Sequence, residues 1–249
     1  MKKNQYLATE NLLGLGERLL EKTGREKLQD PCFVSMYPVE FDSWYCRTQI
    51  TACPYGREVE LAERLASGIR GGELPWLVSV IEEESSNNLI EALERAGFAL
   101  RKPQTGVVLK LEDYEPLRPD AHVVRIGRDR LEEWCSVAAE AFRKKSELRV
   151  MELLVDEPDC DFYGYEVDGK LVSTLLLFRK DGVAGMHEVG TLRDHRRHGF
   201  CRALVNQALV DAREKGCTVA SAQSSVRGKP VYQRIGMRTV CHLRVYDLL

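Results

Sequence analysis

The chain has 249 residues, of which 44% are hydrophobic and 30% charged, and its formal net charge is -2. This composition is typical of a globular protein with a sizeable core, arranged as one large domain or two small ones. The nearly balanced charge argues against a general nucleic-acid binder. No run of 18 apolar residues occurs, so we expect neither a transmembrane helix nor a membrane partner.

The N-terminal residues and the cysteines indicate a cytoplasmic protein. Residues 1–20 contain two lysines but no apolar run that ends in a cleavage site, so they predict an amphipathic helix instead of a signal peptide. The eight cysteines are scattered and form no C-x-x-C pair. Several lie in apolar periodic segments, where a free thiol behaves as a small hydrophobe. We therefore expect reduced cysteines in a reducing compartment.

The first half has the weaker pattern. Helices are predicted over residues 4–22 and 57–69. A strand over 76–82, a helix over 87–98 and two strands over 99–102 and 106–112 follow. Residues 111–122 contain two prolines and lack periodicity, so we interpret them as the linker between two halves.

The second half starts with a predicted strand over 122–127 and helices over 129–145 and 148–155. Three apolar runs then follow at residues 162–167, 170–178 and 183–192. The dipeptides Asp168-Gly169 and Asp181-Gly182 separate these runs. Asp-Gly between strand-like runs is a strong hairpin signal, so we predict a three-stranded antiparallel meander.

The pattern becomes helical after Leu192 and ends at Gly216, a residue typical of a helix stop. Residues 217–223 predict a strand that pairs in parallel with the strand before this helix. A short helix over 228–235, with Pro230 in its first turn, and a final strand over 237–248 complete the chain.

Arg196, Arg197, His198 and Gly199 lie where the long helix is expected to begin. A helix start has unpaired backbone N–H groups and the positive end of the helix dipole, and both favour an anion. Taken alone, the cluster is equally compatible with a solvated basic helix start. The functional alternative is that the cluster binds a phosphate or pyrophosphate.

Two motifs in the second half resemble the GNAT superfamily of acyl-CoA-dependent N-acyltransferases. Its Arg/Gln-x-x-Gly-x-Gly/Ala loop is matched by Arg196, Gly199 and Cys201, the cysteine standing where the family prefers Gly or Ala. Its second motif, a tyrosine followed after three residues by Gly and an apolar residue, is matched by Tyr232 and Gly236, with Met237 in place of Phe. The loop alone is a common pattern, whereas loop, tyrosine motif and strand order together are specific.

The resemblance implies an α/β (α+β) architecture, a mixed, mostly antiparallel twisted sheet flanked by helices. It covers residues 122–249, which we predict to form a GNAT acyltransferase domain. Residues 1–115 are predicted to form an N-terminal α/β domain that is either degenerate GNAT-like or of a related α/β type. RAGF at 95–98 resembles the family's C-terminal turn, but no Arg-x-x-Gly-x-Gly loop precedes it. We therefore expect no cofactor in the first half.

The family's donor is acetyl-CoA, and the resemblance implies which residues bind it. Backbone N–H groups near Gly199 would surround the pyrophosphate, because glycine lets the backbone approach closely. The pantetheine arm would pair with the strand before the turn, where Gly190 is expected to permit a bulge. The complete predicted set is Val189, Gly190, Thr191, Leu192, Arg196, Arg197, His198, Gly199, Phe200, Cys201, Arg202 and Ser225.

The implied reaction is direct attack of an amine on the thioester. Glu188 is a candidate general base, although strand alternation does not settle which way its side chain points. Tyr232 is expected, by resemblance, to protonate the departing thiolate. A strand N–H near Val189–Thr191 would stabilise the oxyanion. Surface or core roles remain alternatives for Glu188 and Tyr232, and Ser225 is as compatible with a plain loop residue.

Other readings are weaker. His195, His198 and Cys201 have metal-ligand spacing, but no fourth ligand is evident, so we expect no metal. Cys201 has no paired base that would make it a nucleophile. The rival to an enzyme is a CoA-binding sensor or scaffold without turnover. The acceptor, a small-molecule or protein amine, and the oligomeric state, a homodimer included, are left open.

Overall fold

The computed structural model describes residues 2–37, 43–82 and 86–249, and side chains are described from Tyr6 onward. Two compact units emerge from the spatial contacts. Unit 1 comprises Met1–Gly14 and Gly106–Val240, and unit 2 comprises Leu15–Thr105 and Cys241–Leu249. Compactness alone does not define an independently folding domain, so the division into residues 1–115 and 122–249 stays a prediction.

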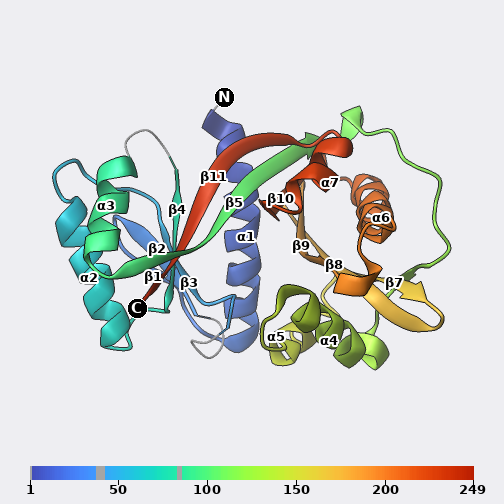
Figure 1. Ribbon diagram of the computed structural model, residues 1–249, viewed down its shortest axis with the longest axis horizontal. Coiled ribbons are helices and arrows are strands. Elements are labelled where there is room, and N and C mark those ends of the chain that lie inside the picture. Colours follow the sequence, from blue (N-terminus) through green and yellow to red (C-terminus); the bar gives the residue numbers. More distant parts are fainter. Residues whose placement is uncertain (1, 38–42, 83–85) are drawn as a thin grey trace. The chain divides into compact units, whose positions relative to one another are not determined.

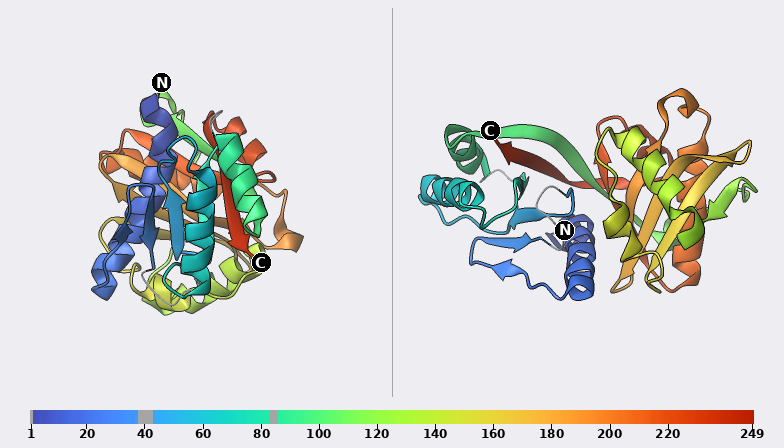
Figure 2. Two further views of the ribbon diagram at one scale, coloured as in Figure 1. Left: turned by 90° about the vertical axis from the view of Figure 1, so that its left-hand side faces the viewer. Right: turned by 90° about the horizontal axis from the view of Figure 1, so that it is seen from below.

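Unit 2 contains three short strands, two helices and a fourth strand. These are β1 (Leu28–Gln29), β2 (Phe33–Met36), β3 (Arg47–Ile50), α2 (Glu58–Arg70), β4 (Leu77–Ile81) and α3 (Asn87–Arg95). The strands follow the order β1-β2-β3-β4-β11, and β11 (Arg238–Leu248) pairs antiparallel with β4. Helices α2 and α3 lie side by side on one face of these strands (Figure 2), and their apolar residues share one hydrophobic cluster with Phe33, Ile50 and Val78.

The sequence patterns did not predict the three short strands of unit 2. They also predicted two separate strands where the structure has one. The two strands predicted over 99–102 and 106–112 are a single strand, β5 (Phe98–Lys110). Its middle residues are exposed and polar and include Pro103. They separate the two predicted strands in the sequence pattern, but the fixed φ of proline is compatible with an extended backbone, so one strand runs through them.

Unit 1 holds the remaining strands and helices (Figure 1). Its strands are β6 (Val123–Arg125), β7 (Cys160–Val167), β8 (Lys170–Lys180), β9 (Val183–Thr191) and β10 (Val219–Ser225). Its helices are α4 (Leu131–Phe142), α5 (Leu148–Glu152), α6 (Phe200–Glu214) and α7 (Lys229–Arg234), with short 3-10 turns η2 (Leu111–Asp113), η3 (Arg128–Arg130) and η4 (Arg193–His195). Helix α1 (Lys2–Thr23), like β5 and β11, contributes residues to both units.

The predicted meander is confirmed. Strands β7, β8 and β9 pair antiparallel in sequence order. The two connecting dipeptides, Asp168-Gly169 and Asp181-Gly182, have positive φ at both residues, as tight hairpin turns with the twist of paired strands require. The parallel pairing of β10 with β9 is also confirmed. The result is an open, mostly antiparallel mixed sheet flanked by helices, in agreement with the predicted fold class.

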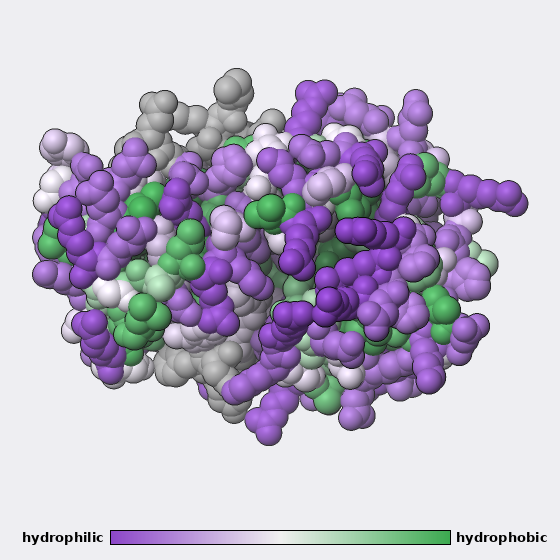
Figure 3. Space-filling view, viewed as in Figure 1, coloured by the Kyte–Doolittle hydropathy of each residue, from purple (hydrophilic) through white to green (hydrophobic). Residues whose placement is uncertain are grey.

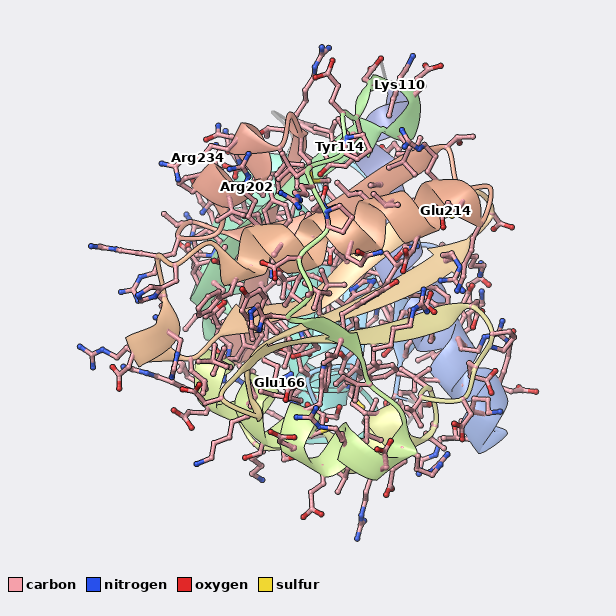
Figure 4. The ribbon with its side chains drawn as sticks, turned by 90° about the vertical axis from the view of Figure 1, so that its right-hand side faces the viewer. Lys110, Tyr114, Glu166, Arg202, Glu214 and Arg234 are labelled. Carbon is pink, nitrogen blue, oxygen red and sulfur yellow. The ribbon has the colours of Figure 1, made fainter. Side chains whose placement is uncertain are left out.

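The two faces of the unit 1 sheet carry different helices. Helix α4 packs on β8 and β9, and α6 packs on β7, β8 and β9. Figure 4 shows α6 on one side of these strands and α4 on the other. The core beneath α6 is apolar and includes Leu204, Val205 and Leu209, all fully buried.

Helix α1 is fastened to the meander by one polar side chain. Asn11 donates hydrogen bonds to the carbonyls of Phe178 and Val183, and its Oδ1 lies 2.9 Å from Nε2 of His187. A Cβ at Gly185 would lie 1.6 Å from Asn11 Oδ1, so this approach requires glycine. His187, on β9, is therefore a structural residue.

The linker predicted over 111–122 forms no strand, and apart from η2 it forms no helix. It is nevertheless anchored where it crosses α6 (Figure 4). Tyr114 donates its hydroxyl to Asn206 Oδ1 at 2.7 Å, and the Leu117 N–H donates to the same oxygen at 2.8 Å. The buried Asn206 amide thus holds this segment against the middle of the helix.

None of the helices in the described part of the chain combines the length and apolar character needed to cross a membrane. On the face shown in Figure 3, hydrophilic side chains cover most of the surface, and hydrophobic ones occur singly or in small groups. Scattered exposed apolar residues, such as Tyr55 and Val226, are normal on a protein surface.

Candidate active site

Strands β9 and β10 separate part-way along their length. Their register runs from Val183 opposite Val219 to Met186 opposite Ala222. Strand β9 continues to Thr191 and β10 to Ser225. Beyond Met186, the backbone of β9 is therefore no longer paired with β10 on that edge, which leaves polar groups for an extended ligand chain. The predicted pantetheine-binding residues Val189–Leu192 lie at this edge.

A bulge lies at the same place, but not for the reason expected from Gly190. Between the pairs Thr174–Gly190 and Leu176–His187 the register shifts, so that two residues of β9 face one residue of β8. The left-handed residue is Glu188, with φ +50°. Gly190 has no positive φ. A Cβ there would lie 2.8 Å from the Phe142 ring, so Gly190 instead allows α4 to approach β9 closely.

The turn that leads into α6 contains two left-handed residues, Arg197 (φ 69°) and Gly199 (φ 90°). Gly199 is the N-cap of α6, and among the described residues no side chain makes a capping hydrogen bond there. The first N–H groups of an α-helix have no partner inside the helix, so those of Phe200, Cys201 and Arg202 point outward together. A Cβ on Gly199 would meet no protein atom within 4 Å, so the space in front of this turn is accessible.

The arginines of the turn divide into two kinds. Arg196 folds back: its Nε donates to the Thr191 carbonyl at 3.0 Å and its Nη2 to the Ala141 carbonyl at 3.2 Å. It therefore braces the turn against β9 and α4. Arg197 and Arg202 are exposed, and Arg202 lies in the first turn of α6 (Figure 4). These two can provide positive charge to an anion at the helix start.

Aromatic rings stack beside the start of α6. Phe200 stacks on Tyr165 with ring centroids 4.2 Å apart, and the exposed His198 stacks on Phe200 at 5.5 Å. His122 also stacks on Tyr165, with centroids 5.8 Å apart. The stack fixes Phe200, and with it the direction in which the first turn of α6 points.

Tyr232, in α7, lies next to this same turn. Only 5% of its surface is exposed, and it shares the hydrophobic cluster that Cys201 contacts. Burial raises the pKa of the Tyr232 phenol, and the neighbouring Cys201 thiol adds to the shift. Burial likewise raises the pKa of Cys201 to about 12, so the thiol stays protonated at neutral pH. This is the wrong state for a nucleophile or a metal ligand.

Glu188 is turned by the bulge toward α4, where its carboxylate accepts a hydrogen bond from Lys144 at 2.6 Å. The Glu188 side chain is 6% exposed and that of Lys144 is 21% exposed. A carboxylate at the part of β9 that is not paired with β10 is placed where a general base would be needed. Lys144 was not anticipated, because it belongs to the basic run Arg143–Lys145, which looks like a solvated helix end.

Two further predictions concern Ser225 and metal ions. Ser225 Oγ accepts a hydrogen bond from the Gly228 N–H at 3.2 Å, so this side chain already closes the turn into α7. Within residues 2–37, 43–82 and 86–249, no group of three or more His, Cys, Asp or Glu side chains is placed to hold a metal ion.

Comparison with protein families identifies one part of the chain. Residues 128–237 match the model of the acetyltransferase (GNAT) family. This segment is a GNAT-family domain. The match spans α4 to α7 and thus contains the separated strands, the turn before α6 and Tyr232. It covers less than half of the chain.

Solved structures extend the similarity of fold beyond that domain. A GCN5-related N-acetyltransferase from Kribbella flavida has a TM-score of 0.70 at 18% identity, and the alignment covers 94% of each chain. A GNAT-family protein from Novosphingobium aromaticivorans has a TM-score of 0.62 at 15% identity, covering 97% of each chain. One from Sphaerobacter thermophilus has a TM-score of 0.63 at 16% identity, covering 86% of this chain and 76% of its own. No curated protein matches by sequence. At these identities the likeness concerns the fold, and it includes the N-terminal part.

Proposed function

We propose that the protein is an N-acetyltransferase that transfers the acetyl group of acetyl-CoA to an amine. The observation that carries the proposal is the coincidence of three features at one place. Strand β9 leaves β10 after Met186, the amide-rich start of α6 follows directly, and Tyr232 lies beside that start. All three features lie within residues 128–237, which match the GNAT-family model.

The residues present fit a nucleotide thioester. The outward N–H groups of α6 and the accessible space at Gly199 suit a diphosphate, and Arg197 and Arg202 add charge. Arg196 acts indirectly, because its guanidinium is committed to the carbonyls of Thr191 and Ala141. The unpaired edge from Val189 to Leu192 suits the amides of a pantetheine arm, and Ser225 stays as part of the turn wall.

The bound thioester supplies an activated acyl group, and the protein's residues manage protons around it. Glu188 accepts a proton from the acceptor's ammonium. Tyr232 remains protonated at working pH because burial raises its pKa. A thiol has a pKa of about 8.5. Full proton transfer from such a phenol to a thiolate is therefore unfavourable, so Tyr232 serves by donating a hydrogen bond as negative charge develops on sulfur.

The cellular setting and partners follow the same proposal. All eight cysteines are free thiols, which supports a reducing, cytoplasmic compartment. The partner is an amine acceptor, either a small molecule or a protein side chain, without nucleic acid or a membrane, and a homodimer is compatible with this scheme. No metal is needed by the chemistry proposed.

A test of the proposal separates binding from turnover. Calorimetry measures the affinity for CoA, and thiol release from acetyl-CoA is followed with amino acids, polyamines, aminoglycosides and lysine peptides. Tyr232→Phe should lower kcat about a hundredfold and change the CoA affinity less than threefold. Tyr55→Phe, at a surface position that is 93% exposed, is the matched control and should change neither.

The same measurements decide against the rival function. Tight CoA binding without thiol release for any amine would favour a sensor or scaffold that retains only the cofactor site. Absence of CoA binding would refute both functions. Full activity of Tyr232→Phe would remove the tyrosine from the mechanism.

A further inference from the structure

The side chain of Lys144 lies beside the Glu188 carboxylate, at the candidate general base. Lys144 Nζ lies 2.6 Å from the Glu188 carboxylate and 5.7 Å from the centre of the Phe142 ring. Carboxylates and aromatic faces both attract cations, the latter through the ring quadrupole. We call the Glu188 carboxylate together with the Phe142 ring the cation seat. It holds the Lys144 ammonium group by an ion pair and a cation–π contact.

The cation seat borders the edge of β9 where the sheet is open. The Phe142 ring lies against Gly190, so close that a Cβ there would come within 2.8 Å. Glu188 belongs to the bulge two residues earlier, in a left-handed conformation that non-glycine residues rarely adopt. Such strain persists where the surroundings impose it and is concentrated at functional sites. The strain here turns the carboxylate toward Lys144.

A small cavity adjoins the seat, and its lining combines apolar and charged side chains. Its apolar wall is formed by Trp134, Cys135, Ala138 and Met151, and its polar groups are Lys144, Glu147 and Glu188. Once the Lys144 side chain is displaced, the space it leaves adjoins this apolar wall, which can then contact the methylene chain of an alkylamine. Two carboxylates in one small cavity disfavour an amine that carries its own carboxylate nearby.

We propose that the acceptor's ammonium group binds in the cation seat and that Lys144 fills the seat until the acceptor displaces it. The inference rests on the proposed acetyltransferase function. It identifies the acceptor class as a primary ammonium on an unbranched aliphatic chain, such as a diamine, a polyamine or a lysine side chain. The internal cation also neutralises Glu188 in the absence of acceptor, because an unpaired buried carboxylate is costly.

The test removes the internal cation and keeps the shape of its stem. Lys144→Met should increase kcat/KM for 1,4-diaminobutane about tenfold, mainly through a lower KM, and leave the CoA affinity unchanged. Glycine, whose amine lies next to a carboxylate, should remain a poor acceptor. Lys145→Met, at an exposed neighbouring position, is the control and should behave as wild type.

A binding measurement without turnover completes the test. n-Butylammonium should bind Lys144→Met at least tenfold more tightly than wild type by calorimetry, and Glu188→Gln in the Lys144→Met background should abolish this gain. A higher KM for 1,4-diaminobutane in Lys144→Met, or no gain in n-butylammonium binding, would overturn the proposal and leave Lys144 as a positioning residue for Glu188. If wild type binds CoA but acetylates no amine, the proposed function fails. The n-butylammonium measurement still shows whether the cation seat binds an ammonium group.

Discussion

The two ends of helix α6 differ in how their polar groups are satisfied. At its N-terminal end, the first amides have no side-chain cap among the described residues, and Arg197 is exposed. At its C-terminal end, Asp211 is buried and accepts hydrogen bonds from the hydroxyl of Tyr163 at 2.6 Å and from Arg125 at 2.5 Å. One end leaves its polar groups accessible, and the other has them satisfied within the protein.

The C-terminal end of α6, which we call the closed end, is part of an ionic network across β6, β7, β8 and α6. Asp161, on β7, is buried and lies within hydrogen-bond distance of Arg125, Arg179 and Lys215. Arg125 links Asp161 to Asp211 and places its guanidinium 5.2 Å from the centre of the Tyr163 ring. The network thus connects three strands with the end of the helix.

This difference indicates how the proposed anion site can be accessible and still belong to a stable scaffold. Backbone donors that await a ligand contribute nothing to folding until it binds, so the helix needs its stability from elsewhere. The apolar face beneath α6 and the ionic network at its far end provide it. Changes at the closed end should therefore alter stability, and changes at the accessible end should alter ligand binding.

The largest expected effect is at Asp161. Asp161→Asn keeps the shape but leaves Arg179, Arg125 and Lys215 together without their common carboxylate. The free energy of unfolding should fall by about 3–5 kcal/mol, as for other broken buried ion pairs. Urea denaturation measures it. Asp156→Asn is the control, because its pair with Arg128 is exposed and should contribute less than about 1 kcal/mol. Equal effects of the two variants would contradict the role of burial.

The pH dependence of the unfolding free energy should show whether the charge of Asp161 causes its effect on stability. Burial by itself would raise the pKa of Asp161, but Lys215 and Arg179 outweigh it and lower the pKa below its ordinary value. A carboxyl whose folded-state pKa is depressed contributes stability above its unfolded pKa of about 3.9, and this is lost as pH falls through the folded value. The difference between wild type and Asp161→Asn should therefore narrow from pH 5 downward. A constant difference from pH 7 to pH 2 would show that charge is not the cause.

Between the two ends, Asn206 fastens the linker to the middle of α6. Asn206→Ala removes the acceptor of the Tyr114 hydroxyl and of the Leu117 N–H. The expected loss is about 1–3 kcal/mol of unfolding free energy, because buried donors lose their partner. Hydrogen exchange at the Leu117 amide should become faster, and the CoA affinity should not change. Unaltered exchange at Leu117 would show that the linker is held by other contacts.

Much of this architecture could be predicted because its signals are local. The two Asp-Gly turns, the apolar face of α6 and its stop at Gly216 each depend on a few neighbouring residues. Strands β1–β3 lacked such signals. They are only two to four residues long, and β3 buries the polar side chains of Arg47, Thr48 and Gln49, so no alternation between polar and apolar residues is visible.

The site was predictable as a loop but not as a set of contacts. The glycine and tyrosine motifs mark the turn and α7, and the structure brings Tyr232 to the first turn of α6. The pair of Lys144 and Glu188 joins residues 44 apart in sequence, and it depends on a bulge that reverses the usual alternation of β9. A register shift depends on how two strands pair, which neither strand's sequence reveals alone.

The smallest effect on folding should come from the two glycines that flank α6, and they form a matched pair. Gly199 and Gly216 have φ of 90° and 82°, and a Cβ at either would meet no atom within 4 Å. Alanine at either position should therefore destabilise the fold equally, by about 1–2 kcal/mol of backbone strain. Only Gly199→Ala places a methyl group where the diphosphate would approach the amides of α6. Its CoA affinity should fall at least tenfold by calorimetry, while Gly216→Ala binds CoA as wild type does. Equal affinities in the two variants would mean that the accessible end of the helix is not the anion site, because the strain they share would then be their only effect.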